Sequence, residues 1–123
     1  MSISPNSLVP FIHVADVSRS VAFYKDLGFA VGNTFEPECK LTWAWLHAQS
    51  ANLMLARADA PVDPAAQTVL FYVYVADVSG AHADLSNKGI PVGPIRTPFY
   101  APRGEFRVED PDGYVLTITP VGD

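Results

Sequence analysis

Two stretches of the chain carry the same motif: residues 14–32 read VADVSRSVAFYKDLGFAVG, and residues 75–93 read VADVSGAHADLSNKGIPVG. They align without a gap at an offset of 61 residues, and nine of the nineteen aligned positions are identical. A period this long with only two copies indicates a duplicated half-domain rather than a solenoid of stacked repeats.

Each copy predicts the same order of secondary structure. The stretches LVPFIHV at 8–14 and VLFYVYV at 69–75 are apolar on both faces, which predicts strands that are covered on both sides. We expect Ser18 and Ser79 to cap the helices that follow, and Gly28 and Gly89 to end them. Three short strands are then expected in each copy, at 29–35, 41–47 and 52–57 in the first and at 91–95, 104–109 and 113–119 in the second. Turns are expected at the matching pairs Ala51-Asn52 and Asp112-Gly113.

These elements predict an α+β fold of two tandem βαβββ modules that form a curved mixed sheet around a cleft. We expect one domain over residues 1–123. The first module should occupy 5–57, a linker rich in Pro, Ala and Asp should occupy 58–67, and the second module should occupy 68–120.

The composition narrows the class of partner. A net charge of −5 disfavours nucleic-acid binding, and it either attracts a cationic small molecule or only keeps the protein soluble. The sequence has no run of about 18 apolar residues, so we expect no membrane span. The first ten residues carry no Lys or Arg ahead of an apolar stretch, and Cys39 is the single cysteine, so we expect a cytoplasmic protein.

Two segments resemble the vicinal oxygen chelate superfamily, which includes glyoxalase I, extradiol dioxygenases and bleomycin-resistance proteins. They are VADVSRSVAFYKDLGF at 14–29 and GEFRVEDPDGYVLTI at 104–118. In metal-dependent members each half supplies one ligand from its first strand and one, usually Glu, from its last strand. The resemblance places these ligands at Val9, Ala56, Leu70 and Thr117, and none of them is His, Glu, Gln or Asp. A shift of two residues on the last strand of the first half would put Met54 there instead.

The resemblance is therefore to the metal-free, bleomycin-resistance-type branch, which implies no metal and no cofactor. Such members bind flat or elongated drugs, often as homodimers, and the bleomycin-resistance proteins sequester their drug rather than alter it. The resemblance implies a protein that binds a bleomycin-like cationic or aromatic drug, with no catalytic residues. The net charge and the lack of a long apolar run predict neither nucleic acid nor membrane as partner. The alternative is a lyase or isomerase with a non-standard site. That site would be a metal held by His13, His47 and an acid, or a metal-free site with His13 or Tyr72 as acid or base.

The candidate ligand-binding residues are side chains, mostly aromatic, that we expect to face the cleft or its mouth. They are Phe11, His13, Trp43, Trp45, Met54, Tyr72, Tyr74, Phe99, Tyr100 and Phe106.

The sequence does not decide which side of the sheet the tryptophan pair faces. Trp43 and Trp45 share one face of a strand, but that face is either the cleft side or the helix side, because Ala44 and Leu46 are an equally good buried row. Tyr72 and Tyr74 mirror Phe11 and His13 at the offset of 61. His82 is expected on the surface of the second helix.

Overall fold

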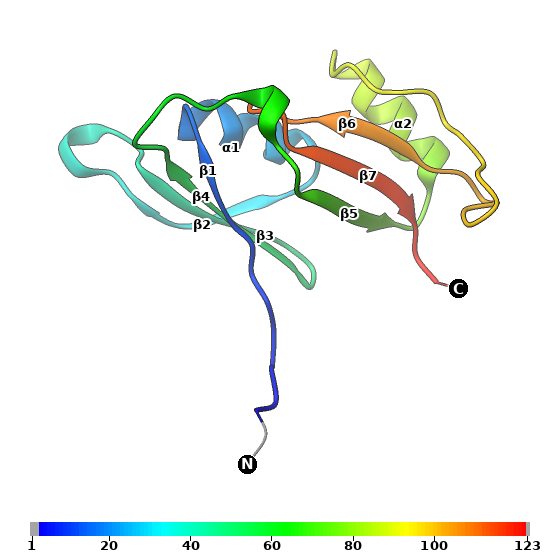
Figure 1. Cartoon of the computed structure of the whole chain (residues 1–123), viewed down its shortest axis with the longest axis horizontal. Helices are drawn as coiled ribbons and strands as arrows, with labels where there is room; N and C mark the ends of the chain where they lie inside the picture. Colours follow the sequence, from blue (N-terminus) through cyan, green and yellow to red (C-terminus); the bar gives the residue numbers. More distant parts are fainter. Residues whose placement is uncertain (1–2, 123) are drawn as a thin grey trace. The chain divides into compact units, whose positions relative to one another are not determined.

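The computed structural model describes residues 3–122 and divides into two compact units, with the boundary between Val62 and Asp63 (Figure 1). Each unit holds one α-helix, one short 3₁₀ helix and one mixed sheet, so the predicted α+β class is confirmed. None of the helices within this described range is long and apolar enough to span a membrane.

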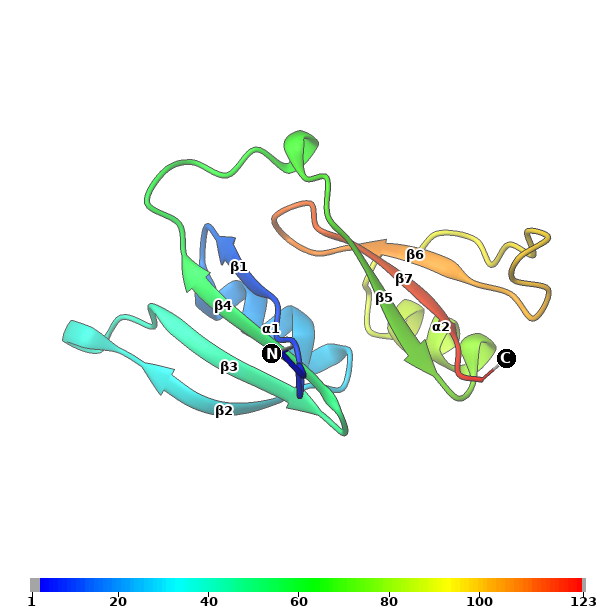
Figure 2. The same ribbon diagram turned by 60° about the horizontal axis from the view of Figure 1, so that its bottom comes forward.

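The first unit has a four-stranded sheet in the order β1-β4-β3-β2, in which β1 runs parallel to β4 and the other neighbours are antiparallel (Figure 2). Its elements in chain order are β1 (Phe11–Val14), α1 (Val17–Asp26), β2 (Ala30–Phe35), the 3₁₀ helix η1 (Pro37–Cys39), β3 (Trp43–Ala48) and β4 (Ala51–Arg57).

One face of this sheet packs against α1, and the core of the unit lies there. Side chains alternate between the two faces of a strand, and in each of β1, β3 and β4 the buried side chains all lie on one face. The buried strand residues are Ile12, Val14, Ala44, Leu46, Leu53 and Leu55, and α1 adds Val17 and Tyr24.

The second unit has a three-stranded sheet in the order β5-β7-β6, with β5 parallel to β7 and β6 antiparallel to it. Its elements are the 3₁₀ helix η2 (Pro64–Ala66), β5 (Leu70–Val75), α2 (Val78–Asn87), β6 (Phe106–Glu109) and β7 (Val115–Pro120). The buried apolar residues of its sheet and helix are Phe106, Val108, Leu116, Ile118, Val78 and Leu85.

The strand expected at 91–95 does not form. Proline has no backbone N–H, so Pro91 and Pro94 cannot donate to a neighbouring strand. Gly93 donates its N–H to the Arg107 carbonyl (2.9 Å), and a single isolated bridge joins Arg96 to Glu105. The second module is therefore one strand short of the first.

The helix caps differ from the prediction at one end. Each helix begins one residue earlier than Ser18 or Ser79, and the capping side chains are Asp16, which accepts from Arg19 N–H (3.2 Å), and Asp77, which accepts from Gly80 N–H (3.0 Å). At the other end Gly28 (φ 101°) and Gly89 (φ 81°) have positive φ, as predicted for residues that end a helix.

The offset of 61 fails in the last strand of each module. Phe11 pairs with Met54 in the first unit, whereas its counterpart Tyr72 pairs with Thr117 in the second, which is an offset of 63. The turn that precedes β4 is also not at 51–52, because Ala48 pairs with Ala51 and leaves only residues 49 and 50 to turn the chain. The position equivalent to Thr117 is therefore Met54, as the two-residue shift anticipated, and not Ala56.

Candidate functional site

Five of the predicted binding residues lie together on the sheet face of the first unit that points away from α1. We call this the aromatic face, and it consists of Phe11, His13, Trp43, Trp45 and Met54. The strand register arranges them in two cross-strand rows, Phe11–Met54–Trp45 and His13–Ala56–Trp43. Ala44 and Leu46 have no exposed surface, so they are the row that packs on the helix side. This settles which face the tryptophans occupy.

The indole of Trp45 is held in one orientation on the aromatic face. Its Nε1–H donates to Asn52 Oδ1 on the neighbouring strand β4 (3.0 Å). Beside it, the rings of Phe11 and His13 lie 5.4 Å apart at 59° to one another, and 49% of Phe11 is exposed. Large rings that are partly exposed and preorganised suit the stacking of a flat ligand. Asn52 was missed by sequence analysis because the residue was expected in a turn.

In the second unit, three predicted tyrosines converge on one pocket of about 410 Å³, which we call the tyrosine pocket. Tyr72 and Tyr74 project from β5 with their rings 6.4 Å apart, and Tyr100 comes from the loop before β6. The pocket is lined by Tyr72, Tyr74, Tyr100, Ala101, Pro102, Arg103, Glu105, Thr119, Pro120 and Gly122. The strand symmetry predicted the first two tyrosines, but it contained no signal for Arg103, Glu105 or Thr119.

The two remaining candidates do not share these surfaces. Phe99 is 96% exposed, contacts the ring of Tyr100 (5.3 Å between centroids), and does not line the tyrosine pocket. Phe106 is only 2% exposed and lies edge-on against the ring of His82 on α2, so it packs in the core of the second unit, and its role in ligand binding stays a prediction.

His82 is also not a surface residue. It is partly buried, and its Nε2 forms a hydrogen bond with the Gly93 carbonyl oxygen (2.9 Å). An imidazole that packs on Phe106 and bonds to the backbone fastens the 91–94 segment to α2.

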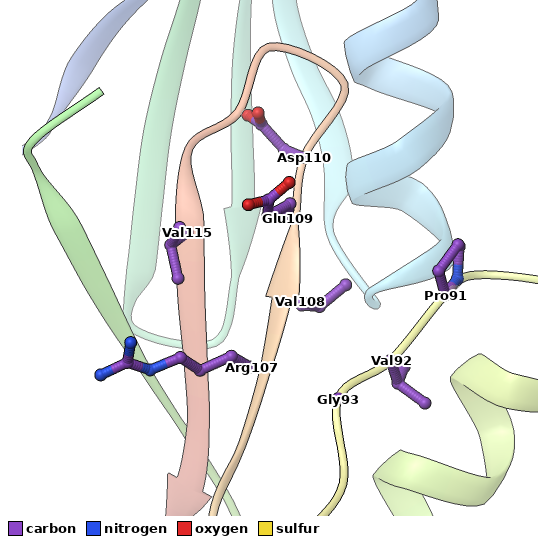
Figure 3. Close-up of a pocket in the computed structure, with 8 residues that line it drawn as sticks. All are labelled: Pro91, Val92, Gly93, Arg107, Val108, Glu109, Asp110 and Val115. Atoms are coloured by element: carbon purple, nitrogen blue, oxygen red, sulfur yellow. The ribbon is translucent and has the colours of Figure 1, made fainter. Parts of the chain in front are cut away.

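Two further pockets border strand β6. One of about 540 Å³ lies between β6 and the 91–93 segment, where Figure 3 shows Arg107 and Val108 pointing to opposite sides of the strand. The other, of about 720 Å³, contains Arg96, Tyr100, Glu105 and Arg107, and Phe106 borders it. The 540 Å³ pocket contains none of the predicted binding residues, so it is not the site that the sequence pointed to.

The family of the chain follows from its sequence. A model of the Glyoxalase/Bleomycin resistance protein/Dioxygenase superfamily matches residues 6–118. The chain belongs to this superfamily. No curated protein resembles the chain closely enough in sequence to count as a relative.

Several solved structures share the fold of this chain. A bleomycin resistance determinant encoded on the transposon Tn5 superposes with a TM-score of 0.78 at 18% identity, over 94% of this chain and 98% of that chain. A bleomycin-binding protein complexed with bleomycin gives a TM-score of 0.78 at 17% identity, over 96% and 100%. An antibiotic-binding protein from Streptomyces sp. CB03234 gives 0.72 at 20% identity, over 99% of each chain.

The positions expected to hold a metal in this superfamily carry poor ligands here. With the observed strand register, the four ligand positions hold Met54, in place of Ala56, and Val9, Leu70 and Thr117. The thioether of Met54 is a weak ligand for a hard cation. Across residues 3–122, His, Cys, Asp and Glu side chains nowhere gather in a group of three that suits a metal ion. The alternative trio of His13, His47 and an acid is therefore not assembled.

Thr117 is fully buried, and its Oγ1 has no hydrogen-bond partner among the residues that the structure describes. A buried hydroxyl without a partner costs about 1–3 kcal/mol of folding free energy.

Thr117→Val removes that hydroxyl and keeps the shape of the side chain. We expect it to raise the free energy of unfolding by about 1 kcal/mol, measured by urea denaturation. Thr119→Val, on the same face of β7, is the matched control. It should not raise the free energy of unfolding, because the Thr119 hydroxyl is not among the buried groups without a hydrogen-bond partner. A loss of stability in Thr117→Val would mean that the hydroxyl is satisfied in solution.

Proposed function

We propose that this protein binds a small aromatic and cationic molecule of the bleomycin type and sequesters it without changing it. The observation that carries the proposal is the aromatic face, where two tryptophans, Phe11, His13 and Met54 share one side of a sheet. A surface of partly exposed rings gains free energy from apolar burial and from stacking when a flat ligand covers it.

Three other features support the proposal. The tyrosine pocket adds a second aromatic surface. A net charge of −5 favours the approach of a cation over long range. Proteins with the same fold include a bleomycin resistance determinant, bleomycin-binding proteins and an antibiotic-binding protein, and they support drug binding as a class of function.

Sequestration rather than turnover is part of the proposal. The superfamily's ligand positions hold Val9, Met54, Leu70 and Thr117, and these side chains offer neither the acids nor the imidazoles of a metal-dependent enzyme. We expect the protein to act in the cytoplasm, and the family resemblance implies a homodimer.

Isothermal titration calorimetry with metal-free bleomycin tests the proposal. We expect saturable binding with a Kd in the micromolar range or tighter, and mass spectrometry of the recovered drug should show an unchanged mass. Bleomycin that returns with an altered mass would replace sequestration with enzymatic modification. An absence of heat at millimolar drug, repeated with copper(II)-bleomycin, would remove bleomycin-like drugs as the ligand.

A further inference from the structure

One buried carboxylate in the second unit has no partner. Glu105 is only 6% exposed, and its backbone is fixed by a pair of hydrogen bonds with Arg96 (2.8 and 2.9 Å). Within residues 3–122, the Glu105 side chain forms no hydrogen bond and no ion pair. Unlike the Thr117 hydroxyl, its carboxylate is not among the fully buried groups without a partner. A carboxylate that is mostly enclosed by its neighbours, yet reaches open pocket space and has no partner within these residues, is available to accept hydrogen bonds from a ligand.

The surroundings of Glu105 are those of a binding pocket. Glu105 lines the tyrosine pocket together with Tyr72, Tyr74 and Tyr100, and it also lines the adjoining 720 Å³ pocket that shares Tyr100. The carboxylate is therefore reached from open pocket space and is walled by aromatic rings.

Within residues 3–122, none of the three arginines that line these two pockets forms an ion pair with Glu105. Arg103, which lines the same pocket, donates through Nη2 to the carbonyl oxygens of Val121 (2.7 Å) and Gly122 (3.3 Å). Arg96 and Arg107 line the 720 Å³ pocket, but both are exposed and neither pairs with Glu105. Their charges are screened by water, whereas a charge in contact with the buried carboxylate is not.

We infer that Glu105 is the anchor for a protonated amine of the ligand, which the tyrosine pocket holds by its rings. This inference rests on the proposed small-molecule binding and names the chemical group that this pocket recognises. An ammonium group donates charge-assisted hydrogen bonds to the carboxylate and is attracted to the faces of Tyr72, Tyr74 and Tyr100. A buried carboxylate among aromatic rings supplies both interactions at once.

Two small probes that share one ring separate the role of charge from the role of apolar contact. They are 2-phenylethylamine, which is a cation at pH 7, and 2-phenylethanol, which is neutral. Binding is followed by the ring resonances of isotope-labelled tyrosines in the full chain. We expect the amine to bind wild-type protein about tenfold more tightly than the alcohol, because a hydrogen bond to a charged group is worth more than a neutral one.

Glu105→Gln keeps the shape of the side chain and removes its charge. In this variant the amine should bind about tenfold more weakly, at the level of the alcohol, while the alcohol is unaffected. Glu109→Gln is the control for the loss of a carboxylate: Glu109 is the last residue of β6, four residues after Glu105, and it is exposed outside the tyrosine pocket, so this substitution should leave both affinities unchanged.

Each contrary result overturns the inference. Equal affinity of the two probes for wild-type protein would do so even if Glu105→Gln fails to fold. So would an amine affinity that survives Glu105→Gln, or a preference for 2-phenylacetate that Arg96→Gln and Arg107→Gln abolish, since the pocket would then recognise an anion. Titrations with bleomycin distinguish a failure of this inference from a failure of the proposed function. If bleomycin binds wild type and Glu105→Gln equally, only the role of Glu105 as the anchor is contradicted. If bleomycin does not bind while the amine does, only the proposed drug class is contradicted.

Discussion

Replacing Trp45 by alanine is expected to weaken bleomycin binding by about 30-fold or more, or ~2 kcal/mol, which is the size of loss found for aromatic residues at the centre of binding surfaces. Trp45 stands in the row Phe11–Met54–Trp45, and Asn52 holds its indole in place (3.0 Å). Alanine removes both the stacking surface and the preorganised ring. Calorimetric titration of the variant with bleomycin measures the loss.

Two controls separate binding from folding in this experiment. Trp45→Phe keeps a flat ring but not the hydrogen bond to Asn52, and it should retain most of the affinity. A thermal melt of Trp45→Ala should stay close to that of wild type, because Trp45 lies on the face opposite the buried core. An alanine variant that binds bleomycin as wild type does would show that the aromatic face is not the binding surface.

The largest effect on stability is expected from Gly113→Ala in the turn between β6 and β7. Gly113 has φ +86°, and a Cβ at this position would lie 2.5 Å from the carbonyl oxygen of Pro64 and 2.6 Å from its Cα. Positive φ and overlap with backbone atoms act together, so we expect a loss of about 3 kcal/mol or more in the free energy of unfolding. The melting temperature should fall by more than about 10 °C in a calorimetric scan.

Gly89→Ala is the matched control for that substitution. Gly89 has nearly the same φ (+81°), but a Cβ there meets no atom within 4 Å. The free energy of unfolding should therefore fall only by the cost of positive φ in alanine, which is about 1–2 kcal/mol. Equal losses in the two variants would mean that the contact between Gly113 and Pro64 does not exist in solution.

The sequence predicted most of the fold because the repeat is a local signal. Three features of each module depend mainly on neighbouring residues: the first strand, the helix after it and the glycine that ends the helix. Their predicted positions agree with the observed ones to within a few residues. Failures arose where a single residue type decided the outcome. Pro91 and Pro94 deny a strand the N–H groups it needs, although the motif around them repeats.

The candidate site was predictable where alternation could be used and was missed elsewhere. Over residues 105–109, which are β6 and the residue before it, the apolar Phe106 and Val108 alternate with charged residues. This period-2 pattern assigns Phe106 to the core and Glu105 to the other face. Applying that pattern would have replaced Phe106 by Glu105 among the candidates. Strand register is different, because it depends on turn lengths elsewhere in the module. The sequence therefore left two registers open for the last strand of the first half, and the structure has the one that changes the offset from 61 to 63.

We propose that the drug binds to the aromatic face of the first unit, and that the tyrosine pocket of the second unit is a further aromatic surface for it. The most direct test is a titration of isotope-labelled protein with metal-free bleomycin, followed by nuclear magnetic resonance. The account predicts that the largest shifts occur at the indole N–H groups of Trp43 and Trp45 and at the rings of Tyr72 and Tyr74, with small changes along α1 and α2. Shifts confined to the helices, or to the pocket formed by the 91–93 segment and β6, would contradict it.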